Sequence, residues 1–145
     1  MNFGFTDDQR FLGDEVRKFV EASYPLRAVR EVIESPGFGG SDATLWNRVA
    51  SLGWPGLCLS EDQGGSGLDL ETLIVVLEEM GRALLPIPLI STVLAAKAIE
   101  RFGSKDQQAR WLPGLADGSR IGTVAVLERE DLLAPAGVSA SARRE

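Results

Sequence analysis

The sequence predicts an all-α fold, an orthogonal bundle of about six helices with one terminal β-strand remnant. Along most of the chain, apolar residues recur at three- and four-residue steps, which is the spacing of one face of an α-helix. Helix-capping residues, and the Pro or Gly residues that end helices, separate these segments. Only residues 121–127 change to a short run rich in β-branched side chains, which is typical of a strand.

The first two helices are expected over about residues 6–23 and 26–34. Thr6 followed by Gln9 is a capping box, and Pro25 marks the end of the first helix. A run rich in Pro and Gly stops the second helix. The expected apolar faces comprise Phe11, Leu12, Val16, Phe19 and Val20 in the first helix and Leu26, Val29 and Ile33 in the second.

A third helix is expected to begin at Ser41 or Asp42 and to end at Gly53, and a fourth to run from Asp69 to about Leu84. Asp and Ser side chains cap helix N-termini, and Gly ends many helices. The fourth helix is so apolar that we expect a central position for it. Its expected apolar residues are Leu70, Leu73, Ile74, Val75, Val76, Leu77, Met80 and Ala83, and Glu71, Glu78, Glu79 and Arg82 are expected to face water.

A corner is expected between these two helices, over Leu52-Gly-Trp-Pro-Gly-Leu-Cys-Leu-Ser-Glu-Asp-Gln-Gly-Gly-Ser-Gly67. Pro55 fixes one backbone angle, and Gly64 and Gly65 are free to take positive φ. The stretch is therefore predicted to be a rigid connection.

The fifth helix is expected over residues 89–102. Ser104 and Gln107 form a second capping box, which opens a sixth helix. Pro113 lacks an N–H group and is expected to end the regular part of that helix.

Residues 121–127 form a lone strand in this prediction, and a lone strand is not stable. The run must therefore pair with another chain or a further portion, or not be a strand at all. We expect a helical domain over residues 1–119 and, over residues 120–145, the start of a β domain followed by a poorly ordered tail.

Composition excludes several classes of protein. The net charge of −6, without a basic stripe, argues against nucleic acid as a partner. Cys58 is the only cysteine, so an intramolecular disulfide and a cysteine-based metal site are excluded, and a reducing cytoplasm fits best. It lies between leucines, where a buried and inert thiol is expected. The longest nearly uncharged stretch is too short to span a membrane.

The residues do not predict a catalytic group or a metal ligand. The chain has no His, and its paired carboxylates, Glu61-Asp62 and Glu78-Glu79, are typical of solvated turns and helix faces. Adjacent carboxylates on a helix point to different sides, so Glu78 and Glu79 form no dyad, although one of them is spaced to pair with Arg82. The glycines at positions 64–67 lack the lysine of a phosphate-binding loop.

Four stretches, in order along the chain, resemble the amino-terminal helical domain of the flavin-dependent acyl-CoA dehydrogenases. The resemblance runs from about Phe5 to Glu128 and includes a Gly-Gly-x-Gly pattern followed by a glutamate-rich helix. The stretches are Leu52 to Leu70, Leu77-Glu-Glu-Met-Gly-Arg82, Pro88-Leu-Ile-Ser-Thr92 and Arg110-Trp-Leu-Pro-Gly-Leu-Ala-Asp-Gly118.

The resemblance implies a longer protein with a helical domain, a β-barrel and a four-helix bundle, assembled as a homo- or hetero-oligomer. Such enzymes use FAD and a glutamate base to dehydrogenate an acyl-CoA between its α and β carbons, and they pass electrons to an electron-transferring flavoprotein. The Pro-rich approach to the fifth helix is similar to bacterial members that act on bulky acyl groups such as steroid side chains.

The fifth helix forms one wall of the acyl pocket in this family. On that alignment Thr92, Val93 and Ala96 are the expected substrate-binding residues, with ordinary helix packing as the alternative. Val126 and Leu127 are expected to border the flavin through their backbone groups.

The sequence departs from the family pattern near its end. Arg129 replaces the proline that usually follows the glutamate, and the Gly-Ser-Asp stretch that holds flavin and CoA is absent. We therefore expect this chain to be inactive alone, as a fragment, a truncated reading frame or one member of a split or hetero-oligomeric enzyme. The alternative is a non-catalytic interaction module that docks on a full-length acyl-CoA dehydrogenase.

Overall fold

The computed structural model describes residues 4–37, 41–125 and 140–141, and within them the chain is all-α, as predicted. No strand is present in these ranges. The α-helices are α1 (Asp7–Ser23), α2 (Leu26–Ile33), α3 (Ala43–Ser51), α4 (Leu70–Arg82), α5 (Leu89–Phe102) and α6 (Lys105–Ala116), and two 3-10 helices, η1 (Trp54–Gly56) and η2 (Glu61–Gln63), lie between α3 and α4.

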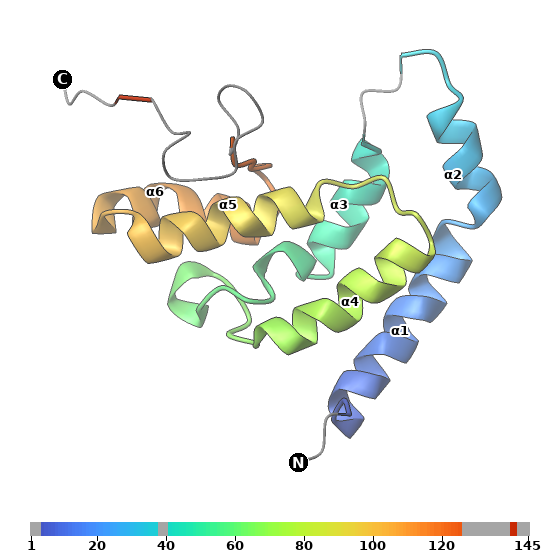
Figure 1. Cartoon of the computed structure of the whole chain (residues 1–145), viewed down its shortest axis with the longest axis horizontal. Helices are drawn as coiled ribbons and strands as arrows, with labels where there is room; N and C mark the ends of the chain where they lie inside the picture. Colours follow the sequence, from blue (N-terminus) through green and yellow to red (C-terminus); the bar gives the residue numbers. More distant parts are fainter. Residues whose placement is uncertain (1–3, 38–40, 126–139, 142–145) are drawn as a thin grey trace.

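The helices pack as two pairs that meet at the corner (Figure 1). α1 lies along α4, and α5 folds back on α6. η1 contacts α3, α5 and α6, and η2 contacts α6. The stretch that the sequence predicts as a rigid connection is therefore central to the packing, with Trp54, Pro55 and Gly56 all buried.

Local capping sets where the helices begin. The Thr6 hydroxyl accepts the Gln9 N–H at 3.2 Å, while the Gln9 side chain accepts the Thr6 N–H at 3.0 Å. Ser104 and Gln107 form the same reciprocal pair at the start of α6. Both capping boxes predicted from the sequence are confirmed, and Asp42 and Asp69 cap α3 and α4.

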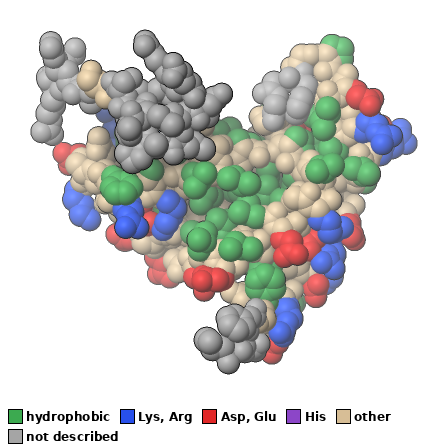
Figure 2. All heavy atoms as spheres, viewed as in Figure 1, with side chains coloured by type: hydrophobic (Ala, Val, Ile, Leu, Met, Phe, Trp, Pro, Cys, Tyr) green, Lys and Arg blue, Asp and Glu red, His purple; other side chains and the backbone are tan. Residues whose placement is uncertain are grey.

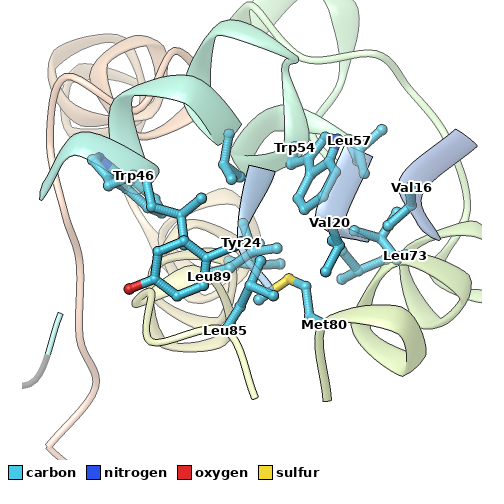
Figure 3. Packing of buried hydrophobic residues seen from close by; sticks show 14 of the residues in the cluster. Val16, Val20, Tyr24, Trp46, Trp54, Leu57, Leu73, Met80, Leu85 and Leu89 are labelled. Carbon is cyan, nitrogen blue, oxygen red and sulfur yellow. The ribbon is translucent and has the colours of Figure 1, made fainter. Parts of the chain in front are cut away.

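The main hydrophobic core lies between α1, α2, α3, η1, α4 and the start of α5 (Figure 3). Trp54 meets Phe19 edge-on, with ring centroids 5.5 Å apart, an arrangement that aromatic quadrupoles favour. A second, smaller cluster forms where α6 covers the corner and α5. It consists of Leu59, Ala96, Leu112, Leu115 and Ala116, with Ile99 packed against it.

α6 continues through Pro113 to Ala116, so the expected end of the helix at Pro113 is wrong. A proline inside a helix removes one backbone hydrogen bond. Here the turn beyond it places Leu115 and Ala116 in the second cluster, and the Pro113 carbonyl still accepts the Asp117 N–H at 3.0 Å. Burial of that turn outweighs the lost bond.

Residues 121–125 form no strand, which corrects that part of the prediction, and Val126 and Leu127 lie outside the described residues. A strand needs a neighbouring strand to hydrogen-bond with, and the described part of the chain offers none. Gly122 instead lies against α5, where a Cβ on it would be 2.7 Å from the Cβ of Ala95.

The two central glycines of the corner serve different purposes. Gly64 has φ 85°, as predicted, but Gly65 does not have positive φ. A Cβ on Gly65 would lie 2.1 Å from the carbonyl oxygen of Leu59. Gly65 is therefore required by close approach of two backbone segments, which the sequence pattern does not distinguish from a positive-φ turn.

α4 differs from its expected amphipathic pattern in two ways. Glu79, expected to face water, is buried, and the apolar residues Leu70 and Ile74 are 62% and 47% exposed. The buried residues of α4 are Leu73, Val75, Val76, Glu79 and Met80.

Candidate functional site

An apolar cavity of about 280 Å³ lies between the end of α4 and the start of α5. Met80 and Leu85 are buried in it, while Leu84 and Ile90 are 60% and 56% exposed at its rim. Figure 2 shows hydrophobic side chains gathered on this face, over α4 and α5. The cavity is lined by Leu77, Met80, Gly81, Leu84, Leu85, Ile87, Pro88, Ile90 and Ser91.

The connection between α4 and α5 shapes this cavity. Pro86 and Pro88 prevent α4 and α5 from forming one continuous helix. The Leu85 N–H donates to the Met80 carbonyl at 3.1 Å, which folds the connection back over the end of α4. The Asp42 N–H donates to the Pro86 carbonyl at 2.9 Å and so fixes the connection to the start of α3.

The described lining of the cavity is apolar apart from one side chain, whose hydroxyl is already hydrogen-bonded. Of the lining residues that the structure describes, only Ser91 has a polar side chain, and its hydroxyl donates to the Pro88 carbonyl at 3.1 Å. None of the described residues that line it has an ionisable side chain. Because a charged or strongly polar ligand group would lose its hydration there without compensation, the cavity is suited to an uncharged apolar chain.

Two lining residues have unfavourable local positions. Leu84 has φ 54°, in the left-handed region, which costs a residue with a Cβ about 1–2 kcal/mol. Gly81 lies in the last turn of α4, where a helical Gly costs about 1 kcal/mol relative to Ala.

The three substrate-binding residues predicted from the sequence lie on the inner side of α5. Thr92, Val93 and Ala96 are all buried, and none lines the cavity. The Thr92 hydroxyl accepts the Gly122 N–H at 3.3 Å. Contact of these three residues with an acyl chain stays a prediction.

Sequence reasoning missed the cavity-lining residues. A signal was present in the uncharged run from Ala83 to Ser91, which carries exposed apolar residues between two helices. Val126 and Leu127, expected near a flavin, lie outside the described residues.

A larger cavity, of about 520 Å³, lies between α1 and the corner. Its lining includes Glu15 and Lys18, which pair with each other at 2.7 Å, beside Leu12, Val16, Phe19, Leu52 and Trp54. We take the α4–α5 cavity as the candidate site because its lining is free of charge and includes both residues in unfavourable local positions.

The buried ionisable groups serve packing. Arg17 and Arg82 both donate to the carboxylate of Glu79, and the hydrogen bond from Arg17 is the main cause that lowers the pKa of Glu79. Burial raises the pKa of the Cys58 thiol, which donates to the Asp69 carbonyl at 3.2 Å. The thiol is therefore a weak nucleophile at neutral pH.

Within the described ranges, no group of three or more Cys, Asp or Glu side chains is placed to hold a metal ion. The helices described here are also too short or too polar to cross a membrane.

The family model for the acyl-CoA dehydrogenase N-terminal domain matches residues 6–119. Acyl-CoA dehydrogenase FadE12 of Mycobacterium tuberculosis is 38% identical over 104 residues, which are 70% of this chain and 26% of that protein. Acyl-CoA dehydrogenase IpdE2 of Mycolicibacterium smegmatis is 37% identical over 120 residues, which are 82% of this chain and 37% of that protein.

Among solved structures, the ChsE4-ChsE5 complex from Mycobacterium tuberculosis contains a similar chain. The TM-score is 0.79 at 28% identity, over 91% of this chain and 36% of that one. A variant of the Tcur3481-Tcur3483 steroid ACAD gives a TM-score of 0.75 at 38% identity, over 86% of this chain and 34% of that one. The chain thus spans between a quarter and two-fifths of the length of these relatives.

Proposed function

The chain belongs to the acyl-CoA dehydrogenase family through its amino-terminal domain, and from this premise we propose that it forms one apolar wall of an acyl-binding site. The reaction would be the flavin-dependent α,β-dehydrogenation of an acyl-CoA thioester. We place the helical domain at residues 1–119 and the start of a second domain at 120–145, and we propose a cytoplasmic location.

The uncharged lining of the α4–α5 cavity is the observation that carries this proposal. An acyl chain is an apolar ligand that leaves no polar group to satisfy, and this lining offers no charge. The cavity volume of about 280 Å³ is near the lower end of the roughly 300–1,000 Å³ of small-molecule sites. It therefore fits part of an acyl chain and not a whole acyl-CoA.

Thr92, Val93 and Ala96 have a supporting place in this proposal. They follow Ile90 on α5 but are covered by other residues, Thr92 by the segment that includes Gly122. We propose that they contact the acyl chain from the inner side of α5, with ordinary helix packing as the alternative.

The cavity does not fit FAD. Among the described residues its lining has no cationic side chain for the phosphates of a dinucleotide, and its polar side chain, that of Ser91, already donates to the Pro88 carbonyl. We propose that the flavin, the glutamate base and the contact with an electron-transferring flavoprotein belong to parts of the enzyme beyond the described residues, with Val126 and Leu127 as flavin neighbours. No catalytic step is assigned to this domain.

Titration of the isotopically labelled 145-residue chain with octanoyl-CoA, followed by amide NMR, tests the proposal. We expect shifts concentrated at Leu84, Ile87, Ile90 and Ser91, and no such shifts with coenzyme A alone. Absence of shifts on the cavity residues would contradict an acyl-binding role. Stoichiometric FAD on the purified chain, reduced by an acyl-CoA, would contradict the expectation that it is inactive alone.

A second candidate function is that of an interaction module that docks on a full-length acyl-CoA dehydrogenase. It is favoured by the exposed apolar residues of α4 and α5, since large exposed apolar patches usually mark a partner surface. They are Leu70 and Ile74 of α4 and Ile90, Leu94 and Phe102 of α5, with Leu84 exposed in the connection between them. Co-purification with a flavoprotein would support this function, and a monomer at micromolar concentration that captures no flavoprotein would count against it.

A further inference from the structure

Two residues at the end of α4 are each the opposite of what a helix terminus favours. Gly81 lies inside the last turn, and Leu84 follows the capping residue Ala83 with φ 54°. Helix interiors favour Ala over Gly, and the residue after a C-cap is most often Gly, because it takes positive φ without strain. A terminus selected for folding alone would carry alanine at position 81 and glycine at position 84.

Packing does not explain either choice. A Cβ on Gly81 would meet no atom within 4 Å, so an alanine would fit. Leu84 is largely exposed and is not part of the hydrophobic core. Every other described residue with positive φ is a glycine, so Leu84 is the exception to a rule that the rest of the chain follows.

Both residues line the α4–α5 cavity. The missing side chain at Gly81 leaves space in the lining, and the leucine at position 84 adds an apolar side chain at the rim, where Ile90 is also exposed. Residues in unfavourable backbone conformations concentrate at functional sites. Both the helical glycine at position 81 and the positive-φ leucine at position 84 line the same cavity. This shared location points to binding of a ligand and not to a role in folding.

We propose that Gly81 and Leu84 determine which apolar chain the cavity accepts. Gly81 keeps the cavity open to a hydrocarbon segment, and Leu84 contacts that segment and becomes buried by it. The chemical class is an uncharged hydrocarbon chain, since no lining residue within the described ranges has an ionisable side chain. This inference rests on the proposed function, in which the cavity takes part of an acyl chain.

The test is the exchange variant Gly81→Ala/Leu84→Gly, made in the full 145-residue chain and compared with the wild type. Urea unfolding measures stability, and NMR titration with octanoyl-CoA measures binding. We expect the variant to unfold at higher urea concentration, because both substitutions follow helix preference. We also expect its dissociation constant for octanoyl-CoA to rise roughly threefold to tenfold, from the lost burial of the leucine side chain.

The single variants separate the two roles, and Ile33→Ala, at an exposed position of α2 away from the cavity, is the control that should leave binding unchanged. An exchange variant that binds octanoyl-CoA as well as the wild type overturns this inference and leaves the proposed function standing. A variant that is less stable than the wild type also overturns it, since the two residues would then serve folding. A wild-type chain that does not bind octanoyl-CoA overturns both proposals.

Discussion

Arg17 of α1 holds the carboxylate of Glu79 on α4 through two hydrogen bonds, of 3.1 Å from Nε and 2.6 Å from Nη2. Nε of Arg82 donates to the same carboxylate at 2.8 Å. Glu79 is buried, whereas both arginines reach solvent. A buried carboxylate needs such partners to remain charged, so this contact fixes α1 against α4.

Replacement Glu79→Gln is expected to lower the free energy of unfolding by about 1–3 kcal/mol, because hydrogen bonds to a charged group are replaced by weaker ones. Chemical denaturation at pH 7 measures the change. Glu78→Gln, at the exposed neighbouring position, is the matched control. Equal stability of the two variants would show that the ion pair contributes nothing beyond surface charge.

The free energy of unfolding should also decrease at acidic pH, because Glu79 becomes protonated. Its pKa in the folded state is below the ordinary value of 4.5, chiefly because of the hydrogen bond from Arg17. A lowered pKa adds stability above the unfolded-state value, and that stability is lost as the pH falls through the folded-state pKa. We expect the difference between wild type and Glu79→Gln to shrink below about pH 4.5, as urea midpoints from pH 7 to pH 3 would reveal.

Replacement Tyr24→Phe is expected to cost about 1 kcal/mol, since the Tyr24 hydroxyl donates to Asp42 at 3.1 Å. Burial, followed by the hydrogen bond to Asp42, raises the pKa of Tyr24 from 10.0 to about 12. This group therefore stabilises the fold fully below pH 10 and loses its contribution as the pH rises through 12. Thermal unfolding between pH 8 and pH 11 should show a steeper loss for the wild type than for the variant.

Replacement Thr92→Val keeps the shape of the side chain but removes the acceptor for the Gly122 N–H. We expect hydrogen exchange of the Gly122 amide to accelerate roughly fivefold, since a hydrogen bond contributes about 1 kcal/mol. Thr92→Ser retains the hydroxyl and should protect this amide as the wild type does. Unchanged exchange in the valine variant would mean that the contact does not hold this segment on α5.

Replacement Gly65→Ala is expected to destabilise the protein by about 3 kcal/mol or more, because the added methyl group would overlap the Leu59 carbonyl. Gly64→Ala, where the added group meets only a side-chain carbon at 3.8 Å but φ is 85°, should cost about 1–2 kcal/mol. The urea midpoints of the two variants measure the destabilisation caused by backbone overlap at position 65 and by an unfavourable φ at position 64. A smaller loss for Gly65→Ala than for Gly64→Ala would contradict this assignment.

Cys58 should react slowly with thiol reagents in the native state at pH 8, since burial raises its pKa and covers its sulfur. The same thiol should react rapidly in urea. Absorbance from an aromatic disulfide reagent measures both rates, and equal rates would contradict a buried, inert thiol.

Features that depend on neighbouring residues were predictable from the sequence. The Thr6 and Gln9 capping box fixes the start of α1 within one turn, and the predicted bounds of α5 agree with Leu89–Phe102. Both rest on hydrogen bonds or turn residues within a few positions of each other.

Features that depend on distant contacts were not predictable. Glu79 is buried because Arg17, 62 residues earlier in the chain, reaches it. The cavity depends on how α4 ends and where α5 begins, and its rim residue Leu84 adopts a backbone conformation that sequence preferences assign to glycine. The packing of the turn after Pro113 was likewise set by the second cluster and not by local preference.

Asp42 connects three parts of the molecule. Its side chain accepts the Tyr24 hydroxyl at the end of α1 and the Leu45 N–H at the start of α3, while its own N–H holds the Pro86 carbonyl beside the cavity. The loop that borders the cavity is thus anchored as soon as these helices assemble. A hydrocarbon ligand would meet a receptor whose form is set in advance, so little of its binding energy would be spent on ordering the protein.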